Sequence, residues 1–275
     1  MIRVLRRIRW PGWVLIIFIA ITFFYISGSM IGANSQAVPT TKKVADHKLK
    51  ETVLHSKQFL VQKDSEVIKS LDRNKKYIAL TFDDGPSSDV TPQVLEALEE
   101  YDVKATFFML GSQAKANPSM ARAVAKAGHE IGNHTNSHQN LVKLDTYDIK
   151  EEFSESARNI EEASGQYPTM SRPPYGKFDK RVEETATALR NSLILWSVDS
   201  MDWKTRNAKM INEEILNSVT PGAIVLMHDI HQETADALPE LLSALINEGY
   251  QFVTVSEILS LSVNVGTGLY YKVNY

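Results

Sequence analysis

The chain has 275 residues, 43% of them hydrophobic and 23% charged, which is enough apolar material for one large domain or two small ones. Its 30 basic and 33 acidic residues give a net charge of -3, which argues against a nucleic-acid partner. Because the chain has no cysteine, disulfides, thiolate catalysis and thiolate metal ligation are excluded, and any metal must be held by His, Asp or Glu.

The N-terminal segment has the pattern of a membrane anchor. A basic head, residues 1–12, precedes an apolar run, residues 13–33, and residues 10–41 contain no charged side chain. Such a run is long enough to span a bilayer, and the arginines would keep the head inside. We therefore expect a single-pass anchor in the cell membrane, with the rest of the chain exported. A signal peptide cleaved after Ala37 is the alternative, although signal cores usually have only about 7–15 residues.

Residues 34–75 are polar and lysine-rich, with apolar residues at loosely helical spacing, and we expect a stalk between membrane and domain. Short apolar runs and longer amphipathic segments then alternate through residues 76–262, and residues 263–275 form a C-terminal tail. The apolar runs predict buried parallel strands at residues 77–82, 104–110, 129–134, 193–199, 223–229 and 251–255. The amphipathic segments predict helices at residues 91–102, 117–128, 146–165, 179–191, 208–219 and 237–249.

This alternation predicts an α/β fold, with a parallel sheet that is either open or closed into a (β/α) barrel and with helices outside it. The C-terminal ends of parallel strands gather at one face, where sites are built. Five segments bring polar side chains to that face. They contribute Asp83 and Asp84, His134 and His138, the segment 172–176, Asp199, and His228.

Two of these segments together predict a metal site. His134 and His138 lie four residues apart, and with a carboxylate from another strand end they match the three-ligand set of a catalytic zinc site. The histidine spacing alone is a weak signal, because two histidines can share a polar loop. The Asp83–Asp84 pair strengthens it. We expect zinc, with Co²⁺ or another divalent ion as the alternative.

The adjacent carboxylates Asp83 and Asp84 can divide two tasks. One can bind the cation while the other acts as a general base. Neighbouring like charges would raise the pKa of a carboxylate, and a metal together with Arg172 would offset that effect. A capped turn entering the next helix is the alternative for this pair.

Five short motifs occur in the order and approximate spacing found in one family. They are TFDDGP (81–86), HTNSH (134–138), RPPYG (172–176), WSVDSMDW (196–203) and IVLMHD (224–229). With these motifs, residues 75–260 resemble the NodB-type polysaccharide deacetylases of carbohydrate esterase family 4. The resemblance implies a distorted (β/α) barrel and a divalent metal, usually zinc, that serves in the removal of N-acetyl groups from amino sugars.

The resemblance assigns the metal and the base to individual residues. Asp83 resembles the general base that activates the attacking water, and Arg172 the arginine that pairs with this base. The three metal ligands are implied to be Asp84, His134 and His138.

The resemblance also implies an acid and a substrate pocket. His228 resembles the general acid that protonates the departing amine, and Asp199 the carboxylate that tunes this acid. The backbone N–H of Tyr175 resembles the oxyanion donor. Leu226 is implied to line the pocket for the acetyl methyl group, and Trp203 to wall the substrate groove.

Three other polar residues lie near the same strand ends. His231, three residues after His228, is a rival for the acid, but only His228 matches the position in the family. For Asp202 and Asp229 we expect helix capping or loop hydrogen bonds.

The expected location suggests the substrate. An exported deacetylase held outside the membrane by a stalk can reach the cell wall, so we expect hydrolysis of the N-acetyl group of N-acetylglucosamine in peptidoglycan, with release of acetate. Chitin oligomers, poly-N-acetylglucosamine, N-acetylmuramic acid and O-acetyl xylan are the alternative substrates within the family. A membrane-anchored glycan-binding protein without turnover is the alternative from another class.

Overall fold

The computed structural model describes residues 71–261 and 269–270. The basic head, the expected anchor at residues 13–33, nearly all of the stalk and most of the C-terminal tail lie outside the described residues. Within the described part of the chain, no helix has both the length and the apolar composition needed to cross a bilayer.

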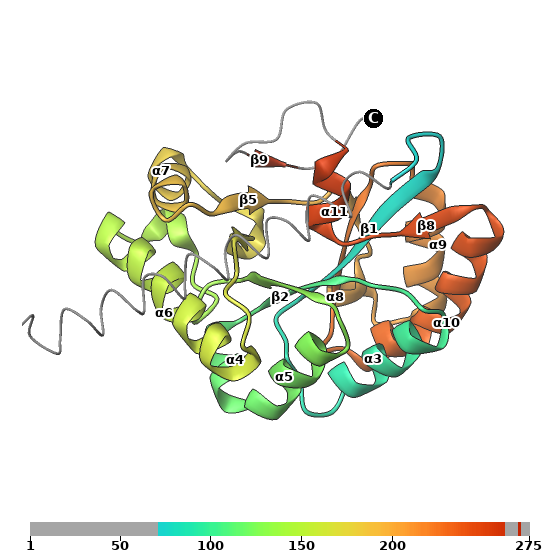
Figure 1. Ribbon diagram of the computed structural model, residues 1–275, viewed down its shortest axis with the longest axis horizontal. Coiled ribbons are helices and arrows are strands. Elements are labelled where there is room, and N and C mark those ends of the chain that lie inside the picture. The colour runs from blue at the N-terminus through green and yellow to red at the C-terminus, as the bar shows by residue number, and fades with distance from the viewer. Residues whose placement is uncertain (1–70, 262–268, 271–275) are drawn as a thin grey trace, which may run out of the picture. The chain divides into compact units, whose positions relative to one another are not determined.

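The centre of the domain is one parallel sheet (Figure 1). Its strands pair in the order β6-β7-β1-β2-β3-β4-β5-β9, and β8 pairs with the first residues of β1. The strands are β1 (Lys76–Asp83), β2 (Thr106–Met109), β3 (Glu130–Asn133), β4 (Met170–Ser171), β5 (Ser192–Ile194), β6 (Val198–Asp199), β7 (Ile224–His228), β8 (Tyr250–Phe252) and β9 (Leu269–Tyr270).

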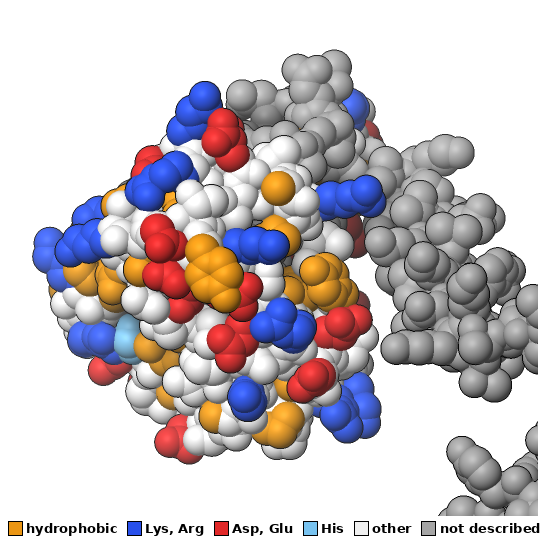
Figure 2. Space-filling view, turned by 90° about the vertical axis from the view of Figure 1, so that its left-hand side faces the viewer, with side chains coloured by type: hydrophobic (Ala, Val, Ile, Leu, Met, Phe, Trp, Pro, Cys, Tyr) orange, Lys and Arg blue, Asp and Glu red, His pale blue; other side chains and the backbone are white. Residues whose placement is uncertain are grey.

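Helices surround this sheet, as the alternation in the sequence predicts (Figure 1). They are α3 (Thr91–Glu100), α4 (Gly111–Ala116), α5 (Pro118–Lys126), α6 (Thr146–Ser164), α7 (Lys180–Ala188), α8 (Asp202–Thr205), α9 (Ala208–Ser218), α10 (Gln232–Asn247) and α11 (Val255–Ser260), with short 3₁₀ turns at Leu141–Lys143 and Pro174–Gly176. All six predicted helices are present. On the face that carries α6 and α7, basic and acidic side chains are interspersed (Figure 2).

One predicted strand is wrong, and the error reveals the curvature of the sheet. Residues 193–199, predicted as a single strand, form the end of β5 and all of β6, which lie at opposite ends of the path from β6 to β5. In a flat sheet six strand spacings would separate them by about 29 Å. The chain from Ile194 to Val198 can span at most about 14 Å. The sheet is therefore curled into a partial barrel, which agrees with the expected (β/α) architecture.

Strand β1 runs through the middle of this barrel wall and divides the core. Ile78, Leu80 and Phe82 belong to the large cluster between the sheet and the outer helices. Tyr77 and Ala79 belong to a second cluster, on the other face of the strand. Because side chains alternate along a strand, Thr81 and Asp83 share the face of Tyr77 and Ala79. The inner face of β1 is therefore apolar at the start of the strand and polar at its C-terminal end.

The close packing of α4 on α6 depends on Gly111. A β-carbon at this position would lie 2.4 Å from the Ser156 Cα atom and 2.7 Å from Asn136 Oδ1. We expect Gly111→Ala to lower the free energy of unfolding by about 1–3 kcal/mol, because backbone atoms of α6 would have to move. Urea denaturation measures the loss. Ser112→Ala, at an exposed position of the same helix, is the control, and an equal loss in both variants would contradict this account.

Candidate active site

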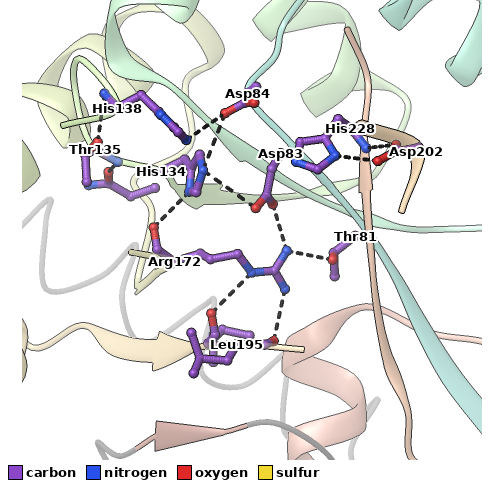
Figure 3. A network of polar contacts seen from close by, with 12 residues as sticks. Thr81, Asp83, Asp84, His134, Thr135, His138, Arg172, Leu195, Asp202 and His228 are labelled. Atoms are coloured by element: carbon purple, nitrogen blue, oxygen red, sulfur yellow. Dashed lines mark hydrogen bonds and ion pairs between the residues drawn. The ribbon is translucent and has the colours of Figure 1, made fainter. Parts of the chain in front are cut away.

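The predicted polar residues of β1, β3 and β7 meet at the C-terminal ends of these strands (Figure 3). The register pairs Asp83 of β1 with His228 of β7, and Thr81 with Leu226. His134 follows directly after β3, and Arg172 directly after β4. Four segments that are distant in the sequence therefore bring charged and titratable groups to one mouth of the barrel.

A change of backbone conformation brings both adjacent carboxylates to this mouth. Asp83 is the last residue of β1, with its side chain on the interior face and only 2% of the residue exposed. In a continuing strand Asp84 would point to the opposite face. Asp84 instead has φ 74°, a left-handed conformation that aspartate tolerates better than most residues. Figure 3 shows both side chains directed toward His134.

Asp84, His134 and His138 form a compact set of potential metal ligands, with all three ligand atoms within 4.8 Å of one another. Asp84 Oδ1 lies 3.4 Å from the Nε2 atoms of both His134 and His138. These distances exceed the usual range for an N–H···O hydrogen bond, about 2.7–3.2 Å. Zinc bonds of about 2.0–2.2 Å in tetrahedral geometry would place ligand atoms roughly 3.3–3.6 Å apart.

Two further observations fit a cation at this position. Asp84 Oδ1 is buried and accepts no hydrogen bond from the described residues. The Nδ1 atom of His134 lies 2.8 Å from the Arg172 carbonyl oxygen, which can only accept, so Nδ1 carries the proton and Nε2 keeps its lone pair. Burial lowers the pKa of His134 to about 3, which keeps the ring neutral, as a metal ligand must be. The residues present therefore fit a divalent metal.

The predicted partnership between Arg172 and Asp83 is present as a buried ion pair. Arg172 Nη1 donates to Asp83 Oδ1 at 2.7 Å, and the arginine is fully buried. The guanidinium also donates to Thr81 Oγ1 and to the backbone carbonyls of Ile194 and Leu195. Burial raises the pKa of Asp83, while the positive charges of Arg172 and His228 oppose that rise. A carboxylate shifted upward in this way is better suited to accept a proton near neutral pH.

The carboxylate beside His228 is that of Asp202, so the expectation for Asp199 is wrong. Asp202 Oδ1 lies 2.7 Å from His228 Nδ1, and Asp202 Oδ2 accepts from the His228 backbone N–H at 2.7 Å and from Thr234 Oγ1 at 2.7 Å. Burial alone would lower the pKa of His228, but the hydrogen bond and charge of Asp202 raise it to about 9. His228 is therefore protonated at neutral pH.

Asp199 makes a different contact, and the backbone geometry explains why Asp202 rather than Asp199 reaches His228. Its carboxylate accepts from the Met201 backbone N–H at 2.9 Å. Met201 has φ 55°, so the chain turns sharply before α8, where Asp202 begins the helix in a fully buried position. Both aspartates belong to the motif WSVDSMDW, so either could have been predicted as the partner of His228. The one that directly precedes Trp203, Asp202, is the partner. The sequence does not reveal the turn that directs the second one to His228.

The two remaining polar residues near the mouth, His231 and Asp229, lie in different environments. Burial lowers the pKa of His231, so this ring favours its neutral form, and His228 is the better proton donor. Asp229 accepts from Thr91 Oγ1 at 2.5 Å, a hydrogen bond between loop and helix as expected. Burial raises the pKa of Asp229 to about 7.

Three residues expected to contact the substrate surround this centre. Leu226 is buried and precedes His228 by two positions on β7, so both side chains lie on the same face of the strand. Tyr175 is 60% exposed, and its ring meets the His138 ring edge-on, with the centroids 4.7 Å apart. Trp203 is 49% exposed and follows Asp202 in α8. The roles of these three residues stay predictions.

The chain is similar to proteins that act on bacterial cell walls. Residues 70–193 match the family model for polysaccharide deacetylases. Over 200 residues the chain is 42% identical to the peptidoglycan-N-acetylglucosamine deacetylase PgdA of Listeria monocytogenes, covering 73% of this chain and 42% of PgdA. It is 40% identical over 189 residues to the peptidoglycan-N-acetylmuramic acid deacetylase PdaC of Bacillus subtilis, covering 69% of this chain and 40% of PdaC. It thus spans less than half the length of these relatives.

Solved structures show the same relationship. The T48 deacetylase with substrate is 36% identical, with a TM-score of 0.69, and the match covers 73% of this chain and all of that one. BA3943 of Bacillus anthracis, described as a pseudoenzyme of carbohydrate esterase family 4, is 33% identical, with a TM-score of 0.65 over 68% of this chain and 66% of its own. Proteins with this fold therefore include both a deacetylase and a pseudoenzyme.

The Arg172–Asp83 pair makes a prediction about stability. We expect Arg172→Leu to lower the free energy of unfolding by about 3–5 kcal/mol at pH 8, because a buried carboxylate loses its counter-charge. Burial already raises the pKa of folded Asp83 above its unfolded value, and without the opposing charge of Arg172 this pKa rises further. The folded state then retains a proton that the unfolded state releases, so the variant's stability falls as pH rises, and the loss at pH 5 is smaller than at pH 8.

Urea denaturation with a chelator present, at both pH values, measures this difference. Arg181→Leu is the matched control, because it breaks an exposed Arg–Asp pair of the same 2.7 Å length, worth about 1 kcal/mol or less. A loss for Arg172→Leu that does not change with pH would show that Asp83 is not its charged partner.

Proposed function

This chain belongs to the polysaccharide deacetylase family, and we propose that it hydrolyses the N-acetyl group of N-acetylglucosamine residues in cell-wall peptidoglycan and releases acetate. One arrangement carries the proposal. The ligand set Asp84, His134 and His138 lies beside a buried carboxylate, Asp83, and the register of β1 and β7 places a protonated histidine, His228, next to that carboxylate. A base, an acid and a metal site at one strand-end face are what amide hydrolysis requires.

Asp83 acts at the start of the reaction. Its raised pKa favours taking a proton from the attacking water, and Arg172 holds the carboxylate in place through Oδ1. Oδ2 remains directed toward His134, at 3.6 Å from its Nε2 atom. Asp84, His134 and His138 would hold a divalent ion, and zinc in such a site lowers the pKa of water and polarises a carbonyl oxygen.

His228 acts at the end of the reaction. An amine leaves more readily when it is protonated, and the imidazolium of His228 supplies that proton while Asp202 holds its Nδ1 atom. Nε2 is thereby left to face the substrate. The Tyr175 backbone N–H is proposed to stabilise the oxyanion, Leu226 to contact the acetyl methyl group, and Trp203 to line the glycan groove.

The choice of substrate rests on two supports. The relatives PgdA and PdaC are named as deacetylases of N-acetylglucosamine and N-acetylmuramic acid in peptidoglycan. The apolar run at residues 13–33, with its basic flank, favours a single-pass anchor that holds the domain outside the cell membrane and facing the wall. N-acetylmuramic acid is the second candidate, because the similarity to PdaC is nearly as high as that to PgdA.

Acetate release by the purified full-length protein tests the activity. We expect release from peptidoglycan, loss of activity with chelator and recovery with Zn²⁺. Asp83→Asn should lower kcat by about 10²–10⁴-fold, because it removes the general base. Asp89→Asn, an exposed carboxylate in the same segment, is the control.

Mass spectrometry of the digested glycan identifies the sugar that loses its acetyl group. Loss from N-acetylmuramic acid would favour the second candidate substrate. Glycan binding without any acetate release would indicate a non-catalytic protein, as BA3943 is described to be.

The pairing of His228 with Asp202 predicts the alkaline limb of the pH profile. Because the protonated ring is the acid, activity falls as pH rises through the pKa of His228. Asp202→Asn removes the charge that raises this pKa, so the fall should begin about 1–3 pH units lower. The pH dependence of kcat and the NMR titration of the His228 ring measure the shift. Asp199→Asn is the matched control, and a shift in that variant instead would restore the original assignment.

A further inference from the structure

The loop between the two histidine ligands has an unfavourable backbone. His134 is anchored next to β3, and the chain then passes through Thr135, with φ 70°, to His138, with φ 59°. Each non-glycine residue in the left-handed region costs about 1–2 kcal/mol. Two such residues within five positions persist only where neighbouring groups hold the loop in place.

The side chain of Glu152, on α6, provides this support. Oε2 accepts hydrogen bonds from the backbone N–H groups of Asn136 at 3.0 Å and Ser137 at 2.9 Å. Oε1 accepts from Ser137 Oγ at 2.6 Å and from Gln139 Nε2 at 3.0 Å. The residue is only 8% exposed. Since a carboxylate has about four lone-pair sites, this one loop uses the full accepting capacity of the side chain.

The other hydrogen bonds that the described residues of α4 and α6 make to the loop reach only its first part. Backbone N–H groups of Gly111 and Ser112, at the start of α4, donate to the carbonyls of Thr135 and Asn136. Asn159 of α6 donates to Asn136 Oδ1 at 3.1 Å. Of these groups on α4 and α6, only Glu152 bonds to Ser137, the residue directly before His138.

The two histidine ligands consequently depend on Glu152 to different degrees. The His134 ring is fixed by its own bond to the Arg172 carbonyl and is 3% exposed. The His138 side chain is 27% exposed, and its backbone N–H bonds to Thr135 Oγ1 within the same loop. A change in the loop would therefore displace His138 more than His134.

We propose that Glu152 is a positioning residue of the metal site, which holds His138 in place for coordination through the loop 135–139. Glu152 touches neither ligand ring and acts through the backbone between them. The inference rests on the metal role of His134 and His138 proposed above.

Zinc affinity of the purified full-length protein, measured by competition with a chromophoric chelator, tests this role without reference to turnover. Glu152→Ala should weaken Zn²⁺ binding by about 10–100-fold, the usual effect of losing a group that orients a ligand. Glu152→Gln should restore most of the affinity, because its amide oxygen can still accept from both backbone N–H groups. Glu162→Ala, at an exposed position of the same helix, is the matched control and should bind as the wild type does.

Two measurements separate positioning from general stability. In the Co²⁺-loaded protein, the visible absorption bands should change in Glu152→Ala and not in Glu162→Ala. In a double-mutant cycle, Glu152→Ala should cost little further zinc affinity once His138→Ala is present, because Glu152 acts through His138. Additive losses would overturn the proposal.

Each remaining result is also decisive. If the wild type binds no zinc, both the metal role and the proposed function fail. If the wild type binds zinc and folded Glu152→Ala binds it equally well, only the role of Glu152 fails. Should Glu152→Ala not fold, Ser137→Ala removes just the hydroxyl that donates to Glu152 and should still weaken zinc binding severalfold, and unchanged affinity there would overturn the proposal.

Discussion

The buried guanidinium of Arg172 is the group that links the barrel to the chemistry. It donates to the carbonyls of Ile194 and Leu195, in the short connection that brings the two sides of the curled sheet together, and to Asp83 at the end of β1. A buried charge costs several kcal/mol unless it is paired, so this position of the arginine requires an ionised partner. The same carboxylate that satisfies the guanidinium is the proposed base. One guanidinium thus contacts both the proposed base and the chain that closes the curl of the sheet.

Regular strands hold some functional groups, and irregular backbone delivers the others. Asp83 and His228 sit side by side because β1 and β7 pair in register. Left-handed residues produce the rest of the arrangement: Asp84 leaves the alternation of β1, His138 ends the ligand loop, and Met201 turns Asp202 toward His228. Unfavourable conformations of this kind persist only when surrounding contacts fix them, as the hydrogen bonds of Glu152 and Asp202 do here. Support for the site is therefore spread over α6, α8 and the loops as well as the sheet.

The sequence allowed those parts to be predicted that depend on a repeating pattern. Apolar runs identified β1, β2, β3, β7 and β8, and amphipathic spacing identified six helices, because burial imposes periods of two and 3.6 residues. β4 and β6 have two residues each, too few for any period, and the run 193–199 continues through a change of strand. Asp83, Asp84, His134, Arg172 and His228 lie close together because each stands at or directly after the end of a strand, whereas His138 reaches them through the loop that follows β3. Asp202 was misjudged because its direction depends on the backbone angle of Met201, which no pattern in the sequence encodes.

Because one relative in this family is described as a pseudoenzyme, catalytic turnover has to be argued from the site itself. Asp83, Asp202, Asp229 and Arg172 are buried almost completely, and Asp229 Oδ1 accepts no hydrogen bond from the described residues. Replacing a buried ion pair as a whole by apolar side chains of similar volume is often neutral or stabilising, so folding alone does not require these charges. A glycan-binding surface needs exposed groups such as Tyr175 and Trp203, and it gains nothing from buried carboxylates. Proton transfer and metal binding are the functions that give these buried groups a purpose, which is why the arrangement favours an enzyme over a binding module.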